Sequence, residues 1–152
     1  MTPSQRLAEL GLTLPEVVPP LAAYVPASRS GDLVFTAGQV PMREGTLLAI
    51  GKVGAEVTAE DATACARQCA LNALAAAASV AGGLDAIQQV VKVVVYVASA
   101  PDFAGQPAVA NGASELLGDV FGDAGRHARS AVGAAVLPLD APVEVELVVR
   151  VA

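Results

Sequence analysis

The clearest pattern of apolar and polar positions lies near the end of the chain, between Gly125 and Ala152. Every second residue from Val143 to Val151 is apolar, and Glu144 and Glu146 fall between them. Because side chains alternate across a strand, both glutamates are predicted to lie on one face. A first apolar run begins at Arg129, and residues 137–142, which include two prolines, separate the two runs. The pattern predicts two strands joined by a short loop.

The rest of the chain changes repeatedly between helix and strand patterns. Thr2 is a predicted N-cap followed by proline, and Gly11 is predicted to end this first short helix. Thr58, with acidic residues in the next turn, is the predicted N-cap of a long helix. The nearly continuous apolar run at 88–98 predicts a central strand covered on both faces. The other predicted elements are a strand at 33–37, a short apolar run at 46–50, and helices at 58–80 and 107–121.

The order of these elements, β-β-(β)-α-β-α-β-β, predicts an α+β sandwich with one sheet and two helices packed on one face. A chain of 152 residues fits one domain and can bury roughly 70% of its unfolded surface. Residues 14–20 hold three prolines and are predicted to be extended. We therefore divide the chain into an N-terminal extension, residues 1–19, made of a short helix and a proline-rich linker, and a single domain, residues 20–152.

Composition indicates an oligomer that does not bind nucleic acid or a membrane. Apolar residues make up 54% of the chain, and this apolarity predicts additional burial between subunits. The net charge is −6 and the nine basic residues form no run, which argues against nucleic-acid binding. No apolar stretch approaches the ~20 residues that span a bilayer, and no secretion signal is recognised at the start of the chain.

Two cysteines, Cys65 and Cys69, lie four residues apart on one face of the predicted long helix. This spacing is poor for a disulfide, and no histidine or further cysteine nearby would complete a metal site. We expect two buried, reduced thiols, no metal and a cytoplasmic protein.

Arg129 and Glu144 are the candidate site residues that the pattern selects. An arginine entering an apolar strand needs an anionic partner, because burying its charge unpaired is costly. That partner is either a glutamate of the chain or the carboxylate or phosphate of a ligand, and Glu144 lies in the same predicted two-strand unit. His127, the only histidine, is predicted to be a loop or interface residue rather than a general base. The chain has no glycine-rich phosphate loop and no Gly-x-Ser-x-Gly motif.

Several landmarks together resemble a known family. They are Tyr24, Thr36-Ala37-Gly38-Gln39-Val40-Pro41, His127-Ala128-Arg129-Ser130, Leu137-Pro138 and Val143-Glu144-Val145-Glu146. In this order and spacing, over about residues 20–151, they resemble the Rid family, also called the YjgF family of reactive imine and enamine deaminases or endoribonuclease L-PSP.

The resemblance implies a chorismate-mutase-like α+β fold assembled as a homotrimer with clefts between subunits. It implies that Arg129 grips a substrate carboxylate and that Glu144 places or activates a water molecule. Tyr24 would line the pocket, and the backbone around Gly38 and Ala131 would provide hydrogen bonds. The implied reaction is hydrolysis of a 2-imino acid, formed from an enamine such as 2-aminoacrylate, to a 2-keto acid and ammonia. It requires no metal and no organic cofactor.

The chain also departs from the family pattern. Ala37 replaces a serine and Ala131 replaces a cysteine that well-known members carry, and His127 occupies a common proline position. Three functions therefore compete: an imine and enamine deaminase, a non-catalytic trimer that binds small carboxylates, and an endoribonuclease or translation inhibitor. The last is the least favoured, because the chain is acidic, poor in aromatic residues and has one histidine.

Overall fold

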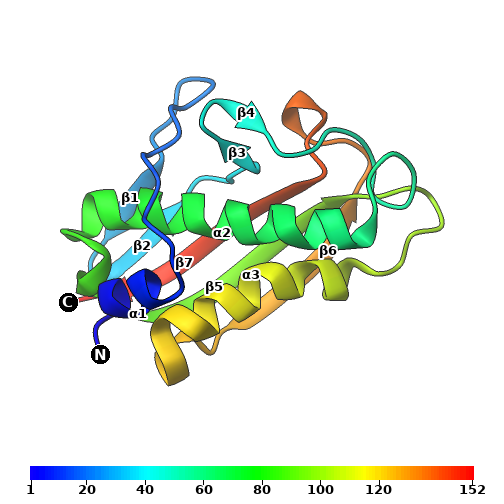
Figure 1. The fold of residues 1–152 in the computed structure, drawn as a ribbon. Coiled ribbons are helices and arrows are strands. Elements are labelled where there is room, and N and C mark those ends of the chain that lie inside the picture. Colours follow the sequence, from blue (N-terminus) through cyan, green and yellow to red (C-terminus); the bar gives the residue numbers. More distant parts are fainter.

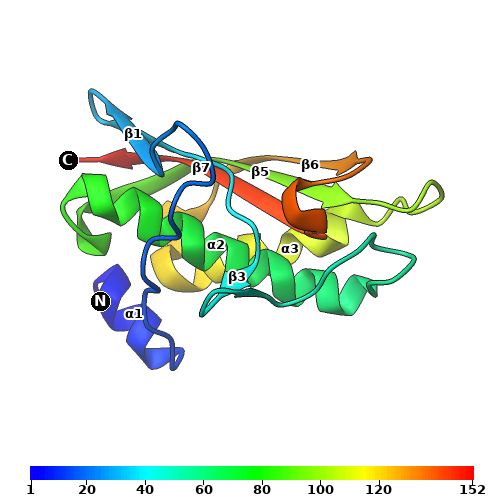
Figure 2. The same ribbon diagram turned by 90° about the horizontal axis from the view of Figure 1, so that it is seen from above.

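The computed structural model describes residues 1–152 and contains one main sheet with its helices on one side (Figures 1 and 2). The sheet has five strands in the order β1-β2-β7-β5-β6. Only β5 and β6 are parallel neighbours, and the other pairs are antiparallel. A separate hairpin is formed by β3 and β4. The strands are β1 (Ala27–Ser30), β2 (Leu33–Thr36), β3 (Met42–Arg43), β4 (Thr46–Leu47), β5 (Ile87–Ala98), β6 (Ala128–Ala134) and β7 (Val143–Val151).

Two long helices, α2 (Ala59–Ala81) and α3 (Gln106–Phe121), lie side by side under the sheet in Figure 2. A short helix, α1 (Pro3–Glu9), packs against α3. Both predicted N-caps are confirmed: Thr2 forms a capping box with Gln5, and the Thr58 side chain accepts a hydrogen bond from the backbone of Asp61. No helix is both long and apolar enough to cross a bilayer. The predicted α+β class, with two helices packed on one face of a sheet, is confirmed.

Small side chains allow the two long helices to approach closely. A Cβ atom at Gly112 of α3 would lie 2.1 Å from the backbone oxygen of Thr63 in α2, so only glycine fits this contact. Most of the buried positions on α2 are alanine or cysteine, and Cys65 and Cys69 are both buried and free. The predicted burial of the two thiols is confirmed. The Ala-rich composition therefore reflects a short distance between the two helices.

The two faces of the sheet differ in their cover. Val93 and Val95 of β5 point toward the helices and are fully buried, each contributing about 1.5–3 kcal/mol of hydrophobic stabilisation. Tyr96, on the opposite face, is only half-buried, while Phe35 and Val132 are 44% and 43% exposed. The strand at 87–98 is an interior strand between β7 and β6, although β7 is the middle one, and within this chain the helices cover only one of its faces. The prediction of cover on both faces is therefore wrong for the single chain.

The last two strands are not neighbours. The sequence pattern predicts that β6 and β7 form one two-strand unit, but β5 lies between them and pairs with both. The connecting loop at 137–142 therefore crosses one end of β5 instead of forming a hairpin. β7 holds the middle position of the five strands, and β5, the longest strand, lies between β7 and β6 with its helix-facing side chains buried.

Candidate functional site

Glu144 lies directly against the backbone of Gly38. The segment after β2 runs beside β7, held by reciprocal backbone hydrogen bonds of 2.8 and 2.9 Å between Gln39 and Val145. A Cβ atom at position 38 would lie 2.7 Å from both Cδ and Oε2 of Glu144. Real Cβ atoms do not approach other heavy atoms so closely, so the absence of a side chain at Gly38 allows the carboxyl group to rest there.

This contact borders a small cavity of about 60 Å³. Its walls include Tyr24, Gly38, Pro138 and Glu144, so the fold brings together three of the predicted site residues. The Tyr24 hydroxyl accepts a hydrogen bond of 3.2 Å from the backbone of Leu21, while the ring remains 46% exposed. The cavity has room for a water molecule beside the carboxyl group.

The surroundings of Glu144 raise the pKa of its carboxyl group. Burial, and secondly the nearby charge of Glu146, raise the pKa of Glu144 above its ordinary value. Glu146 accepts a hydrogen bond of 2.9 Å from the Tyr96 hydroxyl, and this bond is the main cause of the raised pKa of Tyr96. No group of the chain donates a hydrogen bond to the Glu144 carboxylate. A carboxylate with a raised pKa and free lone pairs is suited to accept a proton from water.

Arg129 lies on β6, opposite Val93 of β5, and its side chain is held by α3. The guanidinium Nη1 donates to Asn111 Oδ1 at 2.8 Å and to Ser114 Oγ at 3.2 Å. Nη2 donates to the backbone oxygen of Pro107 at 3.3 Å. These bonds fix the plane of the guanidinium group and leave two of its five N–H donors for an anion.

Two polar residues of this network, Asn111 and Ser114, were not found from the sequence. They lie three positions apart on α3 in a segment of otherwise small and apolar residues, and no local motif marks them. Ser114 also contacts His127, whose Nε2 lies 2.8 Å from the serine oxygen. The Nδ1 of His127 lies 2.6 Å from the backbone oxygen of Gly125, so Nδ1 carries the hydrogen and Nε2 accepts from Ser114. His127 thus holds the start of β6 against α3.

Arg129 and Glu144 are not brought together within one chain. Val93, the cross-strand partner of Arg129, faces the helices, whereas Tyr96, the partner of Glu144, faces the open side of the sheet. Cross-strand partners share a face, so the two candidate residues lie on opposite faces with β5 between them. Ala131 is two positions after Arg129 and shares its face. The expectation that Arg129 and Glu144 lie in one two-strand unit is therefore wrong.

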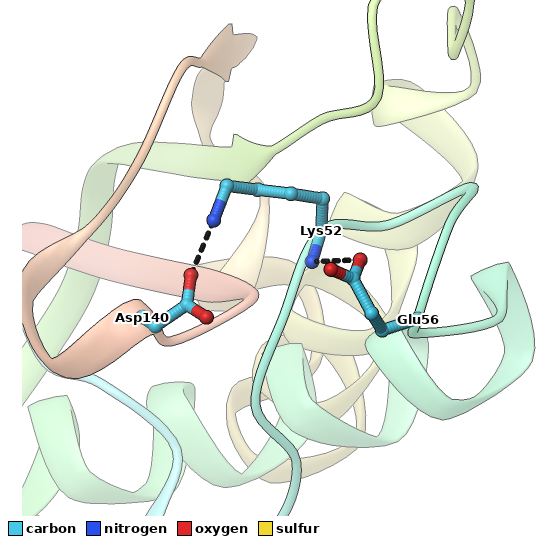
Figure 3. Close-up of polar contacts among 3 residues, drawn as sticks. All are labelled: Lys52, Glu56 and Asp140. Atoms are coloured by element: carbon cyan, nitrogen blue, oxygen red, sulfur yellow. Dashed lines mark hydrogen bonds and ion pairs between the residues drawn. The ribbon is translucent and has the colours of Figure 1, made fainter.

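The loop that carries Pro138 is held from outside the sheet. Figure 3 shows Lys52 reaching from its own loop to the carboxylate of Asp140, with which it forms an ion pair. The backbone N–H of Lys52 donates to Glu56 Oε2 at 3.1 Å. Leu139 and Asp140 both adopt left-handed backbone conformations, with φ of 60° and 56°. This conformation is unfavourable for Leu139, so the ion pair at the next residue helps to hold the wall of the Glu144 cavity.

Known proteins match the chain over almost its full length. Residues 4–151 match the family described as "YjgF/chorismate mutase-like, putative endoribonuclease". The chain is 42% identical over 145 residues to Protein TCP17 of Trypanosoma cruzi, covering 95% of this chain and 91% of that protein.

Solved structures agree with this match. The protein Atu1372 from Agrobacterium tumefaciens is 44% identical, with a TM-score of 0.90 over 99% of this chain and 92% of that chain. A "putative endoribonuclease" from Shewanella oneidensis MR-1 is 36% identical, with a TM-score of 0.96 over 99% and 100% of the two chains. The fold, the landmark residues and these matches together show that this chain belongs to the YjgF family.

Proposed function

We propose that this protein is a hydrolytic deaminase that converts reactive 2-imino acids, and the enamines from which they form, to 2-keto acids and ammonia. The observation that carries the proposal is the placement of Glu144: a half-buried carboxyl group with a raised pKa, seated on Gly38 beside a small cavity. Hydrolysis of an iminium carbon needs a positioned water molecule and one proton acceptor, and Glu144 can serve as that acceptor.

The complete site is proposed to form between subunits of a homotrimer. Arg129 and Glu144 lie on opposite faces of one sheet, so they can share a substrate only when different protomers contribute them. The open face of the sheet exposes apolar side chains, including Phe35 and Val132, that an interface would bury. In a closed ring with head-to-tail contacts, one face of each protomer packs against a different surface of the neighbouring protomer.

In this site Arg129 binds the substrate carboxylate through the two N–H donors that α3 leaves free. Glu144 takes a proton from water as the water oxygen attacks the iminium carbon. The protonated carboxyl group then returns the proton to the nitrogen of the resulting carbinolamine. As the C–N bond breaks, the Glu144 carboxylate takes the hydroxyl proton, so that the carbonyl forms and ammonia leaves. The departing ammonia then accepts this proton and is released as ammonium, which restores the Glu144 carboxylate. Tyr24 and Pro138 are proposed to border the substrate, and the backbone around Gly38 and Ala131 to supply hydrogen bonds.

A second candidate is a trimer that binds small carboxylates without catalysis. It is favoured by Ala131, which lies on the same face as Arg129 and whose side chain carries no group for proton transfer or hydrogen bonding. Ala37, beside Gly38, likewise offers only its backbone. Release of ammonia and keto acid from freshly generated 2-imino acid separates the two candidates. Ribonuclease activity is tested by incubating RNA with the same highly purified protein.

The cytoplasm is the proposed compartment. Cys65 and Cys69 are free and buried, and burial raises the pKa of Cys65 to about 11. A reducing compartment suits a chain whose only cysteines are unpaired. Fractionation of the native cells, followed by thiol labelling of the unfolded protein, would test both the location and the redox state.

Two single variants test the separate roles. Arg129→Lys keeps the charge but loses the planar fork, so keto-acid affinity measured by calorimetry should fall while the fold persists. Glu144→Gln should leave ligand affinity nearly unchanged and lower turnover by about 10² or more. Light scattering coupled to size exclusion should give about three times the 15.2 kDa chain mass. A monomer at micromolar concentration would contradict the shared site.

Mixing two inactive variants provides a sharper test. In heterotrimers of Arg129→Ala and Glu144→Gln chains, some interfaces receive the intact arginine from one protomer and the intact glutamate from the next. Random 1:1 assembly in a ring makes about a quarter of the sites intact, so about 25% of wild-type activity should return. If both residues came from one chain, no site would be intact and no activity would return.

A further inference from the structure

A larger cavity in the molecule includes none of the proposed site residues. It has a volume of about 670 Å³ and lies between residues 11–19 and helix α2, with the β3–β4 hairpin closing one end. Figure 1 shows the N-terminal segment crossing α2 on its way from α1 to β1. The volume falls within the range of about 300–1,000 Å³ that is typical of small-molecule sites.

One wall of the cavity carries an arginine without a partner in the chain. Arg67 of α2 is half-buried, yet its guanidinium group makes neither a hydrogen bond nor an ion pair. The only ion pair of the chain joins Lys52 to Asp140, and neither residue lines this cavity. A guanidinium group that lines a cavity with all of its donors free of protein partners can bind an anion there.

The opposite wall is a segment with unused backbone donors. The backbone of residues 13–20 makes no hydrogen bond to any part of the chain. Leu12 and Leu14 pack against the core and anchor the start of this segment. The residues of the segment that line the cavity include Thr13, Val17 and Val18, whose backbone N–H groups are free. This wall therefore holds backbone N–H groups that are not used within the chain.

The other residues that line the cavity indicate which kind of molecule would carry the anionic group. Met42, Leu48 and Leu71 provide apolar surface for an apolar body. Glu16 and Glu44 also line the cavity and balance the charges of Arg43 and Arg67. The lining therefore has no net charge, which disfavours a ligand that carries several negative charges. We infer that this cavity binds a small organic monoanion with an apolar body, whose charged group contacts Arg67. The inference is independent of the proposed deaminase, because Arg129 and Glu144 lie outside this cavity.

The test uses 1-anilinonaphthalene-8-sulfonate, a monoanion with an apolar body whose fluorescence rises on binding. The chain has no tryptophan, so its own emission interferes little. Arg67→Met keeps most of the side-chain length but removes the charge, and should weaken binding about tenfold or more. Arg126→Met, an exposed arginine outside the cavity, is the matched control and should leave binding unchanged.

A second variant keeps the charge and removes the space. Ala64 is exposed and lines the cavity, so Ala64→Phe should fold normally and block the dye. The carboxylate 4-methylvalerate should displace the dye from wild-type protein, and its neutral amide should not. Arg129→Ala, which removes the carboxylate-binding group of the proposed active site, should bind the dye as the wild type does, whatever its deaminase activity. Unchanged binding in folded Arg67→Met and Ala64→Phe proteins, or equal displacement by acid and amide, would overturn the inference.

Discussion

The replacement Gly38→Ala tests the proposed site without removing any of its functional groups. The added Cβ atom would lie 2.7 Å from Cδ and Oε2 of Glu144, and 3.0 Å from its Cγ. Ordinary contacts begin at 3.4 Å, so the carboxyl group must move by about 0.7 Å, the difference between 3.4 and 2.7 Å. A displacement approaching 1 Å at a reacting group lowers the rate by up to about 10². We therefore expect deaminase kcat to fall by about 10- to 100-fold.

The fold should survive this change. The atoms displaced are at the end of a flexible side chain, and Gly38 does not have a left-handed backbone conformation. The free energy of unfolding should therefore change by less than about 1 kcal/mol. Deaminase kinetics and urea unfolding on the same preparation separate an effect on the site from an effect on the fold.

Two other glycines provide the controls. Gly118 lies in α3, and a Cβ atom added there would meet no atom within 4 Å apart from the neighbouring backbone of its own helix. Gly118→Ala should therefore stabilise the protein by about 0.5–1 kcal/mol and leave activity unchanged. Gly112→Ala would instead push a Cβ against the backbone of Thr63, and should destabilise the fold. Wild-type turnover in a folded Gly38→Ala protein would refute the assignment of Glu144 to the reacting group.

Three further outcomes are expected. Burial raises the pKa of Glu144 in the folded state above the value of 4.5 that it has in the unfolded chain, so its ionisation destabilises the fold as the pH rises above 4.5. Glu144→Gln removes this ionisation and should therefore raise the melting temperature at pH 7. The gain in melting temperature should disappear below about pH 4.5, where the glutamate is protonated in both states. Lys52→Met removes the ion pair with the partly exposed Asp140, so unfolding free energy should fall by no more than about 1 kcal/mol, and high salt should reduce the difference. Cys65 and Cys69 should react with a thiol reagent only after unfolding, and rapid labelling of the native protein would contradict their burial. Replacing both with alanine should lower the free energy of unfolding by about 1–2 kcal/mol without loss of activity.

The sequence alone determined the local elements and the faces that they bury. Alternation from Val143 to Val151 predicts which side chains of β7 enter the core, because successive side chains of a strand point to opposite faces. Thr2 and Thr58 predict helix starts for an equally local reason: each side chain satisfies a backbone N–H within the next three residues. The landmark motifs also identified the family.

Only the tertiary structure decided how these elements combine into a site. The alternation that places Glu144 on one face of β7 contains no information about which strand lies beside it, because strand pairing depends on contacts between distant parts of the chain. The insertion of β5 between β6 and β7, in the registers observed, separates Arg129 and Glu144 onto opposite faces, so in the proposed function the two residues meet only across subunits. The contact between Glu144 and Gly38 likewise arises only when the segment after β2 pairs with β7, since 106 positions of the sequence separate the two residues.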